Sequence, residues 1–211
     1  MSENNAQGVL AIAKEFGLEG LVSVGLDFIP FLSSFNNMRK FNRLERRMKE
    51  SNTQLNRIGQ LSHNSVLAAE YISERIFPIV LADLIEEHED AKINLILTGF
   101  ENVFIEEKSE ESIVINYYDT LRNLRYKDIK RFWYLVGVTD SFERHLINTE
   151  EAAIITSIDR KLERYGLIEI QWDDLENGEY EFVSPSHIKE THYGHRFLQF
   201  ILSNEEKVAE S

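Results

Sequence analysis

The chain contains no cysteine among its 211 residues, which excludes disulfide bonds, thiolate zinc sites and cysteine nucleophiles. Three prolines and ten glycines leave little room for a flexible linker or a low-complexity array. In the apolar N-terminal part, the longest uncharged run is the 11 residues from Phe28 to Met38, whereas a membrane-spanning helix needs about 20. Residues 1–5 show neither the basic start nor the cleavage pattern of a signal peptide. We therefore expect a cytoplasmic protein, with a peripheral membrane location left open.

Acidic side chains outnumber basic ones by 36 to 23, which gives a net charge of −13. The excess is uneven, because residues 1–60 carry 8 basic and 6 acidic side chains whereas residues 61–125 carry 5 and 13. Nucleic acid is not an expected partner of so acidic a chain, since phosphates attract a basic face. The first quarter of the chain is the part best suited to an anionic partner.

Residues 9–35 form a strongly apolar segment. Three glycines and Pro30 within it predict two short helices rather than one long helix. Two interpretations remain open at this point. The segment is either a pair of helices buried in the core or a hairpin active at a membrane interface, because a basic cluster that would suit an anionic surface follows it.

A basic helix is predicted over residues 35–60, since apolar side chains recur there every three or four positions. Its cations form the candidate partner- or membrane-binding site: Arg39, Lys40, Arg43, Arg46, Arg47 and Lys49. Such a helix could bind phosphates, lipid head groups or the acidic remainder of the same chain. The alternative is a solvated face paired with the acidic middle segment.

Residues 64–125 are predicted to form acidic helices. Asn64 or Ser65 caps the first, which Pro78 kinks or restarts. Asp90 caps the second and Ser109 begins the third. We interpret the acidic stretch 86–90 as a solvated turn and not as a divalent metal site, because it lacks the regular oxygen spacing of a calcium loop.

Residues 126–203 change their periodicity and predict an α+β domain, followed by an acidic tail over 204–211. The main helix of this domain begins at the N-cap Thr149 and ends at Tyr165-Gly166. The remaining predicted elements are helices over 126–136 and 141–147, strands over 167–172 and 179–183 joined by an Asn177-Gly178 turn, and a helix over 194–202. This order is that of a winged helix.

Three stretches of this domain resemble the end of bacterial winged-helix proteins: Leu162-Glu163-Arg164-Tyr165-Gly166-Leu167-Ile168, Tyr180-Glu181-Phe182-Val183 and Tyr193-Gly194-His195-Arg196-Phe197-Leu198. The longer order of apolar start, basic helix, acidic helical middle and this ending is similar to the abortive-infection alpha-type proteins of bacterial phage defence. The chain differs from that pattern in the extra segment Ser184–Glu190. The resemblance implies interaction or defence work without a known active site.

The winged-helix order raises the alternative of a DNA-binding transcription regulator. However, the candidate recognition helix carries Glu150, Glu151, Asp159 and Glu163 against Arg160, Lys161 and Arg164. The turn over residues 173–179 is also acidic, whereas a wing normally adds basic contacts. We therefore expect this domain to make protein contacts.

No catalytic signature is found, and no cofactor is expected. His192 and His195 are three residues apart and could share a helix face to hold a metal, but we interpret them as exposed or capping histidines. The sequence thus predicts a mainly α protein with an N-terminal helical region over 1–125 and a winged-helix-like domain over 126–203. Its expected function is that of a non-enzymatic interaction protein of phage defence or phage response, acting through protein or membrane contacts or through self-association.

Overall fold

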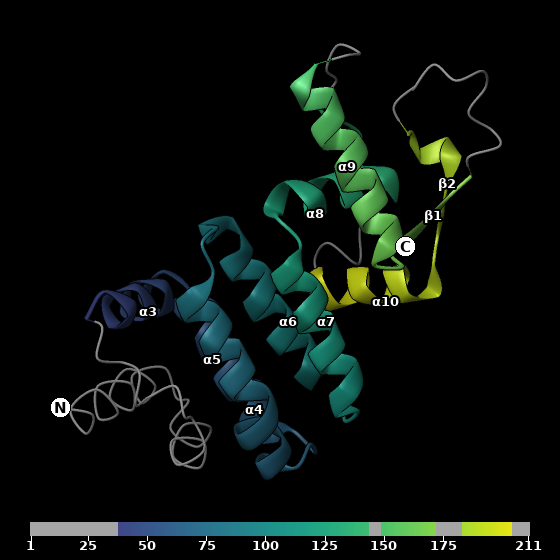
Figure 1. The fold of residues 1–211 in the computed structure, drawn as a ribbon. Coiled ribbons are helices and arrows are strands. Elements are labelled where there is room, and N and C mark those ends of the chain that lie inside the picture. The colour runs from purple at the N-terminus through teal and green to yellow at the C-terminus, as the bar shows by residue number, and fades with distance from the viewer. Residues whose placement is uncertain (1–37, 144–148, 172–182, 204–211) are drawn as a thin grey trace. The chain divides into compact units, whose positions relative to one another are not determined.

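The computed structural model describes residues 38–143, 149–171 and 183–203 (Figure 1). These residues are mainly helical and contain a two-stranded antiparallel sheet, which confirms the predicted class as far as mainly α. The chain divides into two compact units: residues 1–122 with 200–202, and residues 123–199 with 203–211. The apolar segment 9–35 and the acidic tail lie outside the described residues.

The first unit is built from helices that pack in pairs, α3 on α5, α4 on α6 and α5 on α6. In chain order its elements are α3 (Met38–Glu50), α4 (Asn52–Asn64), η2 (Tyr71–Ile76), α5 (Phe77–Glu86), η3 (Asp90–Lys92), α6 (Ile93–Ile105) and α7 (Glu111–Asn123). Figure 1 shows α3 next to one end of α5.

The single helix predicted over 35–60 is wrong, because the chain leaves helical geometry at Ser51, where φ is −100° and ψ is 19°. The break lets each half pack on a different partner, α3 on α5 and α4 on α6. Leu44 and Met48 of α3 and Leu55 and Ile58 of α4 are buried by this packing. The helix also continues to Asn64 instead of ending near Gly59, so Asn64 is not an N-cap.

Pro78 marks a change of helical register, as the sequence predicts. The residues before it, Tyr71–Ile76, form a π-helix that continues into α5. Proline lacks an N–H and its ring clashes with the carbonyl four residues earlier, so a wider turn at this point relieves that clash. The Phe77 N–H bonds to the Ile72 carbonyl across the wider turn.

The core of the first unit centres on aromatic contacts along α6 and α7. The rings of Phe100 and Phe104 meet edge to face at 5.1 Å, and Tyr118 meets Phe200 at the same separation. Phe200 also lies against Gly99, where an added Cβ would come within 2.6 Å of its ring. Residues 200–202 therefore belong to the first unit, whereas the sequence placed them in a domain over 126–203.

The second unit contains α8 (Tyr126–Leu135), α9 (Glu150–Arg164), the strands β1 (Ile168–Ile170) and β2 (Ile188–Glu190), η6 (Pro185–His187) and most of α10 (His192–Ile201). The ends of α9 are as predicted. The Thr149 side chain accepts a hydrogen bond from the Ala152 N–H, and Gly166 follows the helix with φ of +69°. A positive φ suits glycine because it has no Cβ.

The sheet corrects the predicted hairpin. Ile168 pairs with Glu190 and Ile170 with Ile188, so the strand that pairs with β1 lies in the segment Ser184–Glu190. Of the expected return strand, residues 179–182 and the Asn177-Gly178 turn lie outside the described residues, and Val183 is not in a strand. Of the helix expected over 141–147, residues 141–143 are not helical and 144–147 lie outside the described residues.

Candidate functional site

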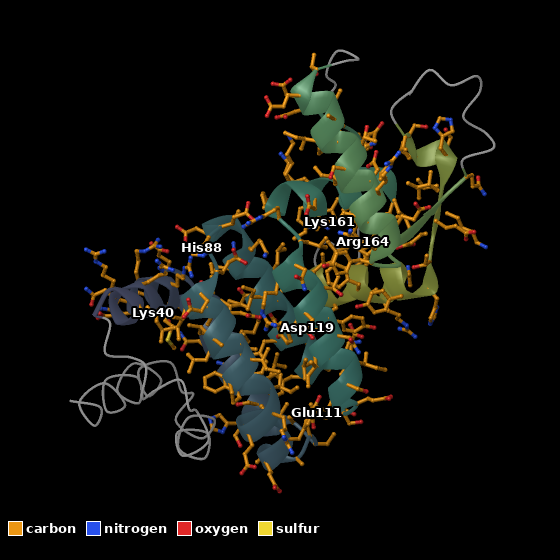
Figure 2. All side chains as sticks on the ribbon, viewed as in Figure 1. Lys40, His88, Glu111, Asp119, Lys161 and Arg164 are labelled. Carbon is orange, nitrogen blue, oxygen red and sulfur yellow. The ribbon has the colours of Figure 1, made fainter. Side chains whose placement is uncertain are left out.

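The candidate site is the basic helix α3 and the acidic end of α5 on which it packs. Figure 2 shows Lys40 on α3 among nitrogen-tipped side chains, and His88 on the turn that follows α5. Two of the six predicted cations, Arg43 and Arg47, donate hydrogen bonds to backbone carbonyls, whereas others pair with carboxylates. Two sequence-distant segments, residues 39–49 and 84–90, thereby form one cluster of charges.

Arg47 is the buried anchor of this cluster, with 3% of its side chain exposed. Its guanidinium donates to the Leu84 carbonyl at 2.6 Å and to the Glu87 carbonyl at 2.8 Å. Leu84 lies in the last turn of α5, where carbonyls have no partner within the helix. A cation at a helix C-terminus also interacts favourably with the helix dipole. Arg47 therefore has a structural role that its place in a charge cluster does not reveal.

Arg43 is the second anchor and precedes Arg47 by one helical turn. Its guanidinium donates to the Ile85 carbonyl at 3.1 Å. Together, Arg43 and Arg47 satisfy neighbouring carbonyls at the end of α5 and fix α3 there. The sequence signal for Arg47 was limited to its place beside the apolar stripe, three residues after Leu44 and next to Met48.

Lys40, Arg46 and Lys49 keep much of their side chains exposed, 37%, 48% and 55% respectively. Lys40 pairs with Glu86. Arg46 pairs with Glu50 within its own helix and with Asp90 across the cluster, both at 3.1 Å. Lys49 pairs with Glu45 at 2.7 Å. Arg39 is exposed as well.

Asp90 is the carboxylate that Arg46 and Arg47 share. Its Oδ1 lies 2.7 Å from Arg47 Nη2 and its Oδ2 lies 3.1 Å from Arg46 Nη2. The hydrogen bond from Arg47 lowers the pKa of Asp90 below its ordinary value of 3.8, and Arg46 acts in the same direction. The same contacts with Glu50 and Asp90 raise the pKa of Arg46. Asp90 begins the short helix η3 and does not cap α6 directly.

A buried ion pair stabilises the turn that carries these carboxylates. Lys92 is almost fully buried, and its ammonium lies 2.5 Å from Glu87 Oε2. Glu87 also accepts from the His88 and Glu89 N–H groups at 2.6 and 2.9 Å. The expected solvated turn over 86–90 is thus a structured connection, in which Glu87 faces inward while Glu86 and Asp90 remain partly exposed.

The candidate recognition helix α9 presents a less acidic face than its composition suggests. Asp159 is 2% exposed and pairs with Arg131, so it does not face solvent. Glu163 accepts a hydrogen bond from the Ile170 N–H at 3.2 Å. Arg160 and Arg164 are exposed, while Lys161 pairs with Asp128 at 2.6 Å.

Of the two histidines considered as metal ligands, His192 is exposed and His195 makes other contacts. His195 Nδ1 lies 3.4 Å from Glu190 Oε2, and its Nε2 lies 2.9 Å from Gln199 Nε2. His187 Nδ1 accepts from the Ser184 N–H at 3.3 Å. Within the described parts of the chain, no group of three or more His, Asp or Glu side chains is arranged to hold a metal ion.

Comparison with known proteins adds no assignment: no protein-family model, curated protein or solved structure matches this chain. In the described residues, each helix is too short or too polar to cross a membrane.

Proposed function

We propose that this chain is a non-enzymatic interaction protein that uses its N-terminal apolar and basic region to contact an anionic membrane surface or a protein partner. The observation that carries this proposal is the division of the cations on α3. Arg43 and Arg47 hold the helix on α5, whereas Arg39, Lys40, Arg46 and Lys49 keep an exposed cationic surface. The protein carries a net charge of −13, so this surface stands out from the rest of the chain.

The position of α3 in the chain favours the membrane form of this proposal. It follows directly after the apolar residues 9–35. Apolar side chains next to a polybasic helix combine the two contributions that bind proteins to anionic bilayers, insertion of apolar groups and attraction to the head groups. Such attraction is screened by salt, so binding should weaken as the ionic strength rises.

Vesicle flotation tests the membrane form. The informative variant changes Arg39, Lys40, Arg46 and Lys49 to Gln and leaves the two anchors in place. The matched control changes Lys130, Arg160, Lys189 and Arg196 to Gln. These are exposed cations of the second unit, so the control alters the net charge by the same amount as the first variant. We expect the first variant to lose flotation with anionic vesicles while the control retains it. Equal flotation of both variants and the unmodified protein at low salt would reject the membrane form.

The phage-defence setting is a proposal that rests on the resemblance of the sequence alone. A bacterial strain that produces the chain should then differ from a strain that carries the empty vector, either in its survival of phage infection or in the phage growth that it permits. The four-residue α3 variant is the test of whether the same surface acts in the cell, because its phage response should match that of the empty vector.

DNA binding by α9 is the second candidate function, and one observation favours it. Asp159 and Glu163 are two of the acidic residues that argue against DNA binding by this helix. Both make contacts within the second unit, whereas Arg160 and Arg164 are exposed to solvent. A recognition helix needs such outward basic side chains. Fluorescence anisotropy with a pool of genomic fragments tests this function. Arg160→Gln with Arg164→Gln should reduce salt-sensitive binding, whereas Lys130→Gln with Lys189→Gln should not.

A further inference from the structure

The cations of α3 differ in how easily they can change partners. Arg47 is buried and bonded to fixed backbone carbonyls, so it cannot leave them without exposing the end of α5. Lys40 and Arg46 instead face the carboxylates of Glu86 and Asp90, which are 46% and 61% exposed. Ion pairs between such exposed side chains are weak and are screened by salt. An external anion can therefore replace these carboxylates without displacing the helix.

We propose that Glu86 and Asp90 act as an intramolecular shield for α3, which an anionic lipid surface displaces when Lys40 and Arg46 transfer from these carboxylates to lipid phosphates. The inference rests on the proposed membrane function. It names anionic lipid as the partner and the two carboxylates as the groups that regulate binding. Arg43 and Arg47 remain bonded to α5 throughout, so the helix binds the bilayer while it stays attached to the first unit.

A lipid surface fits these cations better than a small soluble anion does. Arg39, Lys40, Arg46 and Lys49 are spread along the whole of α3, so a single phosphate could contact only part of the set. A bilayer presents many phosphates in one plane and can engage several of the cations at once. The apolar residues 9–35, next to α3 in the sequence, add a group that a bilayer can bind and an aqueous anion cannot.

The shield should limit binding by an amount that flotation can measure. Removing the carboxylates frees Lys40 and leaves Arg46 paired with Glu50 alone, and each Lys or Arg brought to an anionic surface strengthens binding by about fivefold. Some of this gain would arise from the change in net charge alone. The control must therefore remove equal charge elsewhere on the same unit, and Glu70 and Glu110 are exposed residues suited to this purpose.

The test uses the full chain and vesicles of equal parts phosphatidylglycerol and phosphatidylcholine, with pure phosphatidylcholine for comparison. Glu86→Gln with Asp90→Asn should raise binding about fivefold or more above Glu70→Gln with Glu110→Gln. The amide introduced by Asp90→Asn keeps an oxygen that can accept from Arg47, so the anchor is preserved. Glu86→Gln alone serves as a second variant if the pair unfolds, since Glu86 contacts Lys40 and not an anchor. Inorganic phosphate at equal ionic strength should compete no better than chloride.

Two failures can be told apart. If the four-residue α3 variant floats as well as the unmodified protein and the shield variants float no better than their control, the membrane function itself is rejected. If loss of the α3 cations abolishes flotation but the shield variants match their control, only the shield is rejected. Strong competition by inorganic phosphate would reassign the displaced carboxylates to a soluble anion and overturn the lipid partner.

Discussion

Arg131 and Asp159 form a two-point ion pair inside the second unit, joining α8 to α9. Arg131 Nε lies 2.7 Å from Asp159 Oδ1, and Nη2 lies 2.9 Å from Oδ2. The two side chains are 4% and 3% exposed. Arg131 Nη2 also donates to the Val183 carbonyl at 2.5 Å, and the guanidinium lies 5.3 Å from the centre of the Tyr134 ring. Burial raises the pKa of Asp159, and Arg131 opposes that rise.

Removing one partner of this pair should destabilise the second unit strongly. Arg131→Met leaves a buried carboxylate without its counter-ion and the Val183 carbonyl without its donor, which should cost about 3–5 kcal/mol of the free energy of unfolding. Chemical denaturation measures this loss. Arg131→Met with Asp159→Leu should recover most of it, because two apolar side chains leave no charge unpaired.

Lys130→Met is the matched control, since Lys130 is the exposed neighbour of Arg131 on α8. It should change the free energy of unfolding by less than about 0.5 kcal/mol. A single variant Arg131→Met as stable as this control would contradict the burial of the pair.

The helices whose ends carry local signals were predictable from the sequence. Thr149 caps α9 and Gly166 follows its end, and both positions are set by side-chain and backbone chemistry within a few residues. Pro78 likewise acts on its immediate neighbours, because it perturbs the helical turn directly before it. The mainly helical class follows from the same periodic patterns.

The elements that depend on distant contacts were not predictable. The break at Ser51 exists because α3 and α4 pack on different helices, and the sequence around Ser51 contains neither glycine nor proline. The partner of β1 was misplaced because the Asn177-Gly178 signal suggested a short hairpin, whereas β1 pairs with residues 188–190. The anchoring by Arg43 and Arg47 requires the end of α5, which the sequence does not place beside α3.

Acid should weaken the turn that carries Asp90. Burial alone would raise the pKa of Glu87, but hydrogen bonds from Lys92 and from backbone N–H groups outweigh it and lower that pKa below its ordinary value of 4.5. A carboxyl with a lowered folded-state pKa stabilises the fold above its unfolded-state pKa. That stabilisation is lost as the pH falls through the folded-state pKa. We therefore expect the free energy of unfolding to decrease below a pH of about 4.5.

Glu87→Gln identifies the contribution of this carboxyl. The variant should lose about 1–3 kcal/mol at neutral pH, because the buried Lys92 ammonium keeps no carboxylate partner at Glu87. Its free energy of unfolding should also depend less on pH in the acid range. Denaturant midpoints measured across that range, with Glu110→Gln as the exposed control, test both statements. An unchanged acid dependence in Glu87→Gln would assign the effect to other carboxyls.

Asn102 should contribute to the first unit through the end of α10. This buried side chain donates to the Phe200 carbonyl at 2.8 Å and to the Leu202 carbonyl at 2.9 Å. The final carbonyls of a helix have no internal partners, and burial keeps water from replacing the amide. Asn102→Ala should therefore cost about 1–3 kcal/mol. Hydrogen exchange of the core amides and denaturant unfolding measure the loss, and Asn116→Ala, at an exposed position of α7, is the control.

Gly194 should tolerate no side chain, because α10 begins against the turn that follows α9. A Cβ built at Gly194 would lie 1.9 Å from the Leu167 carbonyl oxygen, which is backbone and cannot rotate away. Thr191 fixes this approach, since its hydroxyl accepts from the Gly194 N–H at 2.8 Å and donates to the Gly166 carbonyl. Gly194→Ala should therefore destabilise the second unit by at least about 1–3 kcal/mol despite the better helix propensity of alanine.

His195→Ala separates this steric effect from helix propensity, because His195 is the exposed next residue of the same helix. Its unfolding midpoint should stay close to that of the unmodified protein or rise slightly. Protection of the α10 amides against hydrogen exchange should fall in Gly194→Ala and persist in His195→Ala. If Gly194→Ala were instead as stable as His195→Ala, the start of α10 could not lie against the Leu167 carbonyl, because no rotation of a side chain can make room for the added methyl group.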